Sequence, residues 1–416
     1  MKRHLIALVG ALLAVLAVAA GPAQAQSVQG VEQSAATGQS AESSANSTQV
    51  APSNSNISVR IFSPGDGGNV SQSNTSAAGS VAGNAAATAQ GVLQSQGGSG
   101  EQAVGQQAET GQHASSNAES KQIKPSNSNI SVRIHSPGDD GDVEQSNNSV
   151  AGSAAGNLAE TEQLAGQQQG GGGKCCHGGG AGVQAVGQKA ETGQKAESEA
   201  TSVQEHASNE NIPVRIHSEG DNGSVTQSNN SAAFSFAGNA ASTEQAVEQS
   251  QADGCGCSGD LVQAVGQKAF TGQIAKSDAT SIQKGAKNSN TPVRIFSKGD
   301  DGDVDQSNNS LALSKAFNAA QTKQLVGQSQ GGGCECDDRK KSDGGAGVQA
   351  VGQWADTFQK ADSDATSLQF YPSNTNAPVR EKSWGGGGSV AQSNNSLAAS
   401  AALNLARTLQ GVRQEQ

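Results

Sequence analysis

The feature that most constrains this chain is a series of residues that recurs at every second position in five near-copies of one unit. In the third copy the series runs from Val225 to Gln251 and is rich in Gln, Asn, Ser, Thr and Ala; the fifth copy repeats it from Val390 to Gln416. The intervening residues differ freely between the copies. Alternate residues share one face only in a β-strand, because its side-chain period is two whereas a helix needs 3.6. The pattern therefore predicts long strands with one repeated face.

Each unit contains a second alternating segment upstream of this one. In the third copy it runs from Gln184 to Gln204, and read backwards it matches the later segment, so that Ser202 meets Ser231. Like facing like in this way is the register of an antiparallel hairpin, which predicts that the two segments pack beside or over one another. Parallel stacking of equivalent segments from successive units would also keep like residues together. The sequence does not choose between the two arrangements.

A shorter predicted hairpin separates the two segments, with a turn rich in Pro, Gly and Asp at residues 137–142 of the second copy. Glycine-rich connectors then lead to the next unit. The expected fold is all-β, a repeat array or β-solenoid of five units, each with two long alternating strands and a short hairpin. The expected boundaries are residues 1–25 for a signal peptide and 26–98, 99–182, 183–260, 261–347 and 348–416 for the five repeats.

The start of the chain has the layout of a cleaved secretory signal. Lys2 and Arg3 precede an apolar run from Leu5 to Ala20, and a small-residue cleavage pattern ends at Ala25. No later segment has the apolar length of a membrane span. The chain is therefore expected to be secreted, and to be extracellular or at the cell surface. With 37 acidic and 26 basic residues it is a poor candidate for binding nucleic acid.

The composition excludes a conventional core. Aromatic residues make up 3% of the chain and there are 54 glycines, so large side chains cannot fill an interior over this length. A thin buried layer of amide and small side chains is expected instead, because amides form hydrogen-bonded ladders along a stacking direction. The residues predicted to form this structural ladder are Gln188, Gln194, Ser198, Ser202, Gln227, Asn229, Ser231, Ser235, Asn239, Thr243 and Gln245. The same composition is also typical of disorder, which leaves a disordered cell-surface spacer as an alternative.

Three of the connectors contain cysteines. Disulfide pairing within or between these loops is the expected use in an oxidising exterior, and bridges between loops would join neighbouring units. The cysteines predicted to pair are Cys175, Cys176, Cys255, Cys257, Cys334 and Cys336. Metal binding, assisted by His177, Asp337 and Asp338, is an alternative, and free or intermolecular thiols are another. No cofactor is expected.

No catalytic constellation is visible in the sequence. Two groups of aspartates suggest calcium, but they lack the full spacing and the closing Glu of a calcium loop, and Asp is common in turns. They are Asp139, Asp140, Asp142 and Asp300, Asp301, Asp303. His135 and His217 are replaced by Phe or Lys in the other copies, which a catalytic role would not tolerate. The one charge present in every unit is an arginine, expected to form a structural or surface row: Arg60, Arg133, Arg215, Arg294 and Arg380. We expect the protein not to be an enzyme.

One spacing in the later segment carries a family resemblance. The pattern Asn239-x-Ala241-x-x-x-Gln245, repeated from Asn404 to Gln410, resembles the repeats of curlin, the secreted subunit of bacterial curli fibres. The curlin repeat is shorter and has a Gly between its Gln and Asn that this chain lacks. The resemblance implies a β-solenoid that adds subunits end to end into amyloid-like extracellular filaments.

The expected function is structural, as a subunit of an extracellular filament, matrix or surface coat assembled by β-strand stacking. Self-association is the expected interaction, with cell-surface or matrix components as further partners. The alternative is a soluble extracellular adhesin or binding module for a glycan, a surface or a metal. The outward positions of the earlier segment are charged, as at Lys189 and Glu191, whereas the later segment carries Phe234, Phe236 and Leu403. That apolar face is expected to pack on another layer rather than to be an adhesive patch.

Overall fold

The expected all-β repeat architecture is confirmed by the computed structural model, which describes residues 27–97, 100–170, 182–252, 261–331 and 347–415. These ranges contain 17 strands and no helix. The strands are β1 (Ser27–Val50), β2 (Ser53–Ile61), β3 (Val70–Gly97), β4 (Gly100–Ile123), β5 (Ser126–Ile134), β6 (Val143–Gly170), β7 (Gly182–Glu205), β8 (Ser208–Ile216), β9 (Val225–Ala252), β10 (Leu261–Lys284), β11 (Lys287–Asn290), β12 (Val293–Ile295), β13 (Val304–Gly331), β14 (Gly347–Phe370), β15 (Ser373–Asn376), β16 (Val379–Glu381) and β17 (Val390–Glu415).

The strands form three parallel sheets, and neighbouring strands in each sheet come from successive units. Sheet A has the order β1-β4-β7-β10-β14, and sheet C has the order β17-β13-β9-β6-β3. Sheet B contains the short strands β2, β5, β8, β11 with β12, and β15 with β16. Equivalent residues lie directly opposite one another, so that Gln188 pairs with Gln106 on one side and with Gln267 on the other. Of the two arrangements left open by the sequence, parallel stacking forms the hydrogen-bonded ladders.

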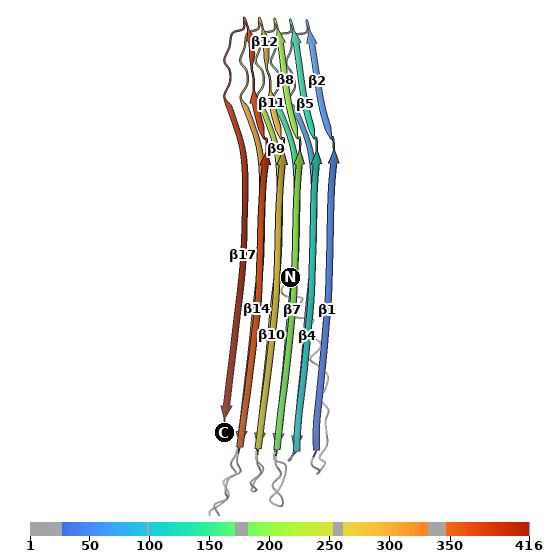
Figure 1. Cartoon of the computed structure of the whole chain (residues 1–416), viewed down its shortest axis with the longest axis vertical. Helices are drawn as coiled ribbons and strands as arrows, with labels where there is room; N and C mark the ends of the chain where they lie inside the picture. The colour runs from blue at the N-terminus through green and yellow to red at the C-terminus, as the bar shows by residue number, and fades with distance from the viewer. Residues whose placement is uncertain (1–26, 98–99, 171–181, 253–260, 332–346, 416) are drawn as a thin grey trace, which may run out of the picture.

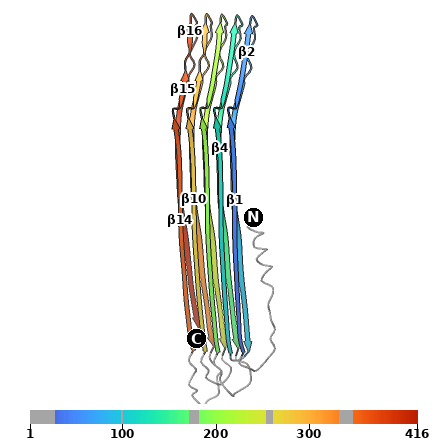
Figure 2. The same cartoon turned by 45° about the vertical axis from the view of Figure 1, so that its right-hand side comes forward.

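Each unit is a long, flattened loop of chain (Figure 1). The chain runs along sheet A, bends into sheet B, turns, and returns along sheet C, so that sheets A and C lie face to face. The two long strands are nearly straight arms, with 24 residues in β1 and 28 in β3 (Figure 2). The bend between sheets A and B has a residue with positive φ in every unit, at Ala51, Lys124, His206, Gly285 and Tyr371.

The residues that match when the two long segments are read in opposite directions face each other across the interior, between sheets A and C. The Oγ atoms of Ser202 and Ser231 lie 2.9 Å apart, and Ala200 and Ala233 belong to one buried cluster. Within the described residues every strand pair joins different units, so the antiparallel match describes how sheet A faces sheet C and not a hydrogen-bonded hairpin. The interior is therefore a thin layer of small and amide side chains held between two parallel sheets.

The segment expected as a short hairpin is one strand of sheet B followed by a turn. Strand β5 pairs with β2 and β8, and the chain that returns to β6 is not hydrogen-bonded to it as a strand. The physical reason is that inward side chains separate the two arms. The guanidinium of Arg133 lies between them and donates Nη2–H to the Asp139 carbonyl at 2.7 Å. The turn is thus an arch filled by side chains.

Candidate functional site: side-chain ladders and two open ends

Interior glutamines form ladders that connect every unit to the next. The Gln194 amide donates Nε2–H to Gln112 Oε1 at 2.7 Å and accepts from Gln273 Nε2 at 2.7 Å. Its second N–H reaches across the interior to the Ala240 carbonyl at 2.9 Å. Each of these amides therefore stabilises both the stacking of units and the contact between sheets A and C. Gln188, Gln227 and Gln245 occupy equivalent ladders.

Interior asparagines form a second set of ladders. Asn239 is 1% exposed; it accepts from Asn157 at 2.8 Å and donates to Asn318 Oδ1 at 2.9 Å and to the Ile274 carbonyl at 2.7 Å. Asn229 likewise accepts from Asn147 and donates to Asn308, both at 2.9 Å. Both polar atoms of each side chain are thereby satisfied, which allows an amide to be buried at little cost.

Interior serines join the two sheets in a zigzag. Ser198 Oγ donates to Ser153 Oγ at 2.9 Å, and Ser235 Oγ donates to Ser198 Oγ at 2.9 Å. Ser202 and Ser231 make the same kind of contact. Of the eleven residues predicted for the ladder, all are buried, and ten are hydrogen-bonded in this way.

Thr243 is the exception. It is 1% exposed, and its Oγ1 has no hydrogen-bond partner within the described residues. Thr161, Thr192, Thr271 and Thr322 share this state in the central units. The alternating pattern places a threonine inside the sheet sandwich, but it does not reveal whether the hydroxyl can reach a partner.

The arginine row is a buried structural element at the arch. Arg215 is 0% exposed, and it donates Nε–H to Asn222 Oδ1 at 2.8 Å and Nη1–H to the Gly138 carbonyl at 2.8 Å. Burial lowers the pKa of its guanidinium, while the nearby Asp140 acts in the opposite direction. Sequence reasoning left structural and surface roles open. The charged side chains themselves gave no sign of burial, because a buried arginine depends on carbonyls that only the folded arch supplies.

The acidic residues of the arch are engaged by protein groups. Asp140 pairs with Arg133 at 2.6 Å, and Asp301 pairs with Arg294 at 2.8 Å. Asp139 accepts the backbone N–H of Asp221 at 2.8 Å, which links two successive turns. Within the described residues no group of three or more His, Cys, Asp or Glu side chains is placed to hold a metal ion. The aspartates considered for calcium act here in ion pairs and turns.

A row of rings lies at the outer corner of the arch. Phe62, His135, His217 and Phe296 stack with centroid spacings of 4.9 to 5.1 Å and nearly parallel planes. Each of these residues has a positive φ, between 47° and 50°, which is unfavourable for a bulky side chain. Stacking along the row offsets part of this strain. His and Phe therefore play the same structural role at this position of the unit.

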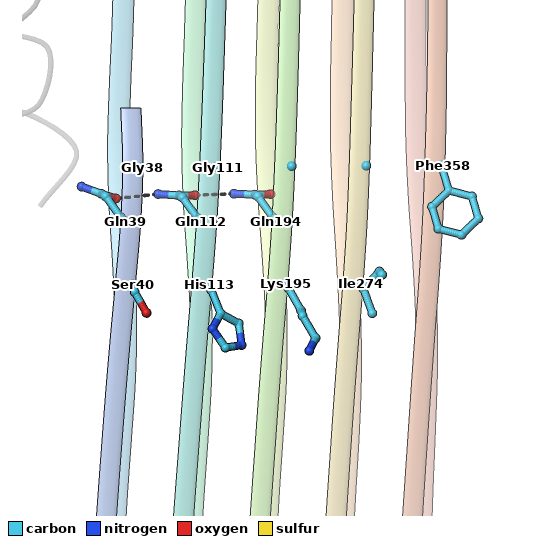
Figure 3. Close-up of a pocket in the computed structure, with 12 residues that line it drawn as sticks. Gly38, Gln39, Ser40, Gly111, Gln112, His113, Gln194, Lys195, Ile274 and Phe358 are labelled. Carbon is cyan, nitrogen blue, oxygen red and sulfur yellow. Dashed lines mark hydrogen bonds between the residues drawn. The ribbon is translucent and has the colours of Figure 1, made fainter. Parts of the chain in front are cut away.

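A shallow groove of about 670 Å³ crosses the outer face of sheet A (Figure 3). Its floor is a row of glycines, Gly38, Gly111, Gly193 and Gly272, which ends at Phe358. Beside it, Glu197 is bound by Lys195 at 2.9 Å and lies 3.4 Å from His113. Partial burial raises the pKa of Glu197, but the contacts with Lys195 and His113 outweigh burial and lower it. His113 and Lys195 line the groove, and both are engaged by Glu197.

The two ends of the stack expose sheet edges. Strands β1 and β3 are the outer strands at one end, and β14 and β17 are the outer strands at the other. Residues of β17 that would be buried in a central unit are exposed here. Within the described residues no further strand covers either end. An uncovered parallel edge is a template for another strand.

The side-chain ladders have a direction. Each interior glutamine donates to its equivalent in the preceding unit, as Gln194 does to Gln112, whereas each interior asparagine donates to its equivalent in the following unit, as Asn239 does to Asn318. The β1 end therefore presents asparagine oxygens and glutamine N–H groups, and the β17 end presents the opposite set. Each end is complementary to the other end and not to itself.

Comparison with protein-family models, with curated proteins and with solved structures finds no match. The predicted signal peptide lies outside the described residues, as do all six cysteines proposed to form disulfides and the metal alternative that includes His177. Among the strands and turns that the structure describes, there is no helix long and apolar enough to cross a membrane.

Proposed function

We propose that this protein is a secreted, non-enzymatic structural subunit of an extracellular filament, matrix or surface coat. Copies add head to tail, with unit 1 of one copy on unit 5 of another, so that all three parallel sheets continue across the junction. The observation that carries this proposal is the pair of mutually complementary ends, which no strand of the described residues covers.

The chemistry of the junction repeats that of the interior. Among the described residues, Asn394 is the last member of the ladder that begins at Asn74; it accepts from Asn308 at 2.8 Å, and no described strand lies on its other side. In a head-to-tail contact its N–H would donate to Asn74 Oδ1 of the added copy, as Asn229 does to Asn308. A head-to-head contact would instead place like groups against each other, which leaves buried amides unpaired.

The first test is negative-stain electron microscopy of purified residues 26–416 at neutral pH under oxidising conditions. Regular filaments are the expected result. Persistent discrete particles would overturn the proposal and favour the alternative of a soluble adhesin or binding module.

Asn394→Asp makes the test specific to the end. The aspartate can still accept from Asn308, and it is exposed in the isolated chain, so folding should change little. At a junction its carboxylate would face the Asn74 oxygen, which costs about 3–5 kcal/mol for a buried unpaired charge. We therefore expect the critical concentration for assembly to rise by about 100-fold or more.

The matched control is Thr366→Asp, in the same terminal unit. Thr366 is exposed on the outer face of sheet A, in a row that already contains Glu119. The Thr366→Asp variant adds the same charge outside the ladders, so its critical concentration for assembly should stay near that of the wild type. Equal inhibition by both variants would show that net charge, and not the ladder contact, controls assembly.

A further inference from the structure

The outer face of sheet C carries a broad apolar patch, here called the C-face. It consists of five rows that cross all five strands, and Lys315 is its one charged residue. The rows are Ala77, Val150, Ala232, Leu311, Leu397; Gly79, Gly152, Phe234, Leu313, Ala399; Val81, Ala154, Phe236, Lys315, Ala401; Gly83, Gly156, Gly238, Phe317, Leu403; and Ala85, Leu158, Ala240, Ala319, Leu405.

The C-face is exposed in the single chain. Val81 is 75% exposed, Leu158 46% and Leu403 53%, and no described element packs on them. The expectation that this face packs on another layer is therefore not met within the described part of the chain. The outer face of sheet A differs, because its strand β7 carries Lys189, Glu191 and Lys195. The two faces of the molecule are thus chemically distinct.

Small and large side chains alternate between the units along the rows of the C-face. In one row units 1 and 2 carry glycine where units 4 and 5 carry large residues: Gly156 is in the same row as Phe317, and Gly83 is in the same row as Leu403. Other rows have the reverse order, since Leu158 of unit 2 shares a row with Ala319 of unit 4. Space lies above several of the small residues, since a Cβ on Gly79 or Gly152 would meet no atom within 4 Å and one on Gly156 would meet only a backbone oxygen at 3.8 Å. A two-fold axis along β9 would bring unit 1 of one copy against unit 5 of another. In the row that contains Gly156, Gly83 would then meet Leu403 and Gly156 would meet Phe317, while Gly238 would lie opposite Gly238 of the other copy.

We propose that the C-face is a self-complementary interface that binds a second copy of this chain back to back, with the two stacks running in opposite directions. The face spans about 30 Å along the strands and about 24 Å across them, from about 3.3 Å per residue and about 4.8 Å per strand. Two such faces bury roughly 1,400 Å² in total, which is within the range of stable protein–protein interfaces. An isologous contact of this kind is closed by its two-fold symmetry.

This lateral pairing uses a different surface from head-to-tail growth and does not depend on it. The test is sedimentation velocity of residues 26–416 with and without Asn394→Asp, the substitution that removes the end contact. Both are expected to contain a dimer. In the Asn394→Asp protein, adding Leu158→Lys should weaken that dimer by about 100-fold or more, because it removes a buried leucine and adds a second cation of the same sign to an interface that already contains Lys315.

Ile274→Lys is the matched control, because Ile274 is also an exposed apolar residue but lies on the outer face of sheet A. It should leave the dimer unchanged. A second pair of variants tests the two-fold register. Gly156→Phe should disrupt the dimer by opposing Phe317 of the other copy, and adding Phe317→Gly should restore it. The fold accommodates a phenylalanine in this row, as Phe317 shows.

A monomer at all accessible concentrations would overturn the proposal. Equal loss of the dimer in Leu158→Lys and Ile274→Lys would also overturn it, and so would failure of the double variant to recover. Flotation of a monomeric wild type with phosphatidylcholine vesicles, abolished by Leu158→Lys, would assign the C-face to a lipid surface instead. If filaments fail to form but the dimer behaves as expected, only the head-to-tail proposal falls.

Discussion

Asn239→Asp is the perturbation that most directly tests the interior ladders. The substitution replaces an N–H donor by an oxygen of nearly equal size, at a side chain that is 1% exposed. The native amide donates to Asn318 Oδ1 at 2.9 Å and to the Ile274 carbonyl at 2.7 Å. An ionised aspartate would place its charge against both oxygens. The introduced carboxyl is therefore expected to stay protonated in the folded state.

The magnitude follows from this forced protonation. Keeping a carboxyl neutral at pH 7, when its unfolded pKa is about 3.9, costs about 4 kcal/mol. The single O–H can serve only one of the two acceptors, and the lost hydrogen bond costs about 1 kcal/mol more. The free energy of unfolding at pH 7 should therefore fall by about 5 kcal/mol relative to the wild type.

The pH dependence has a definite sign. The folded-state pKa of the introduced carboxyl would be raised above its unfolded value, so the folded variant binds a proton that the unfolded chain releases. The deficit should shrink as the pH falls from 7 toward 4, and only about 1 kcal/mol should remain below that. The variant should also assemble more slowly than the wild type at pH 7, and this difference in assembly rate should shrink over the same pH range.

The assay is urea unfolding followed by circular dichroism at several pH values, with each variant compared to the wild type at the same pH. The control is Asn148→Asp, on the outer side of sheet C, where the side chain accepts from Asn230 at 2.9 Å and an aspartate can still do so. It should change stability by less than about 1 kcal/mol. Wild-type stability for Asn239→Asp at pH 7, or a deficit that does not vary with pH, would refute the proposed role of this ladder.

Three further outcomes are expected. Thr243→Val should raise the free energy of unfolding by about 1 kcal/mol, because it removes a buried hydroxyl that has no partner within the described residues. Ser231→Ala, which breaks the contact with Ser202, should lower the free energy of unfolding, and destabilisation by both variants would contradict the unpaired state of Thr243. Arg215→Lys should destabilise the fold by about 3 kcal/mol by removing hydrogen bonds to arch carbonyls, whereas Arg413→Lys at an exposed site should have no measurable effect in thermal unfolding. Burial, then the charges of Glu244 and Glu160, raise the pKa of Glu162, so Glu162→Gln should have a higher free energy of unfolding than the wild type at neutral pH. This difference in stability should narrow as the pH falls through the folded-state pKa, and a difference that widens would contradict the raised pKa.

Much of the interior could be predicted from alternation alone. Because a strand directs every second side chain to one face, the repeated series identified the inward residues, including Asn239 and Gln245. The arch was less accessible to this reasoning. Its Pro, Gly and Asp suggested a hairpin, whereas the structure places the Arg133 side chain between the two arms. The role of that arginine depends on carbonyls from residues that are distant in sequence, such as Gly65 at 2.7 Å.

The sequence by itself determined the all-β class, the five-unit repeat and the inward face, because side-chain period is a local property of the backbone. Only the tertiary structure decided that equivalent strands stack in parallel while the two long segments face each other across the interior. Both arrangements keep like residues together, so composition and spacing could not separate them. The direction of the ladders and the bare C-face also emerged only in three dimensions, because each depends on which units become neighbours.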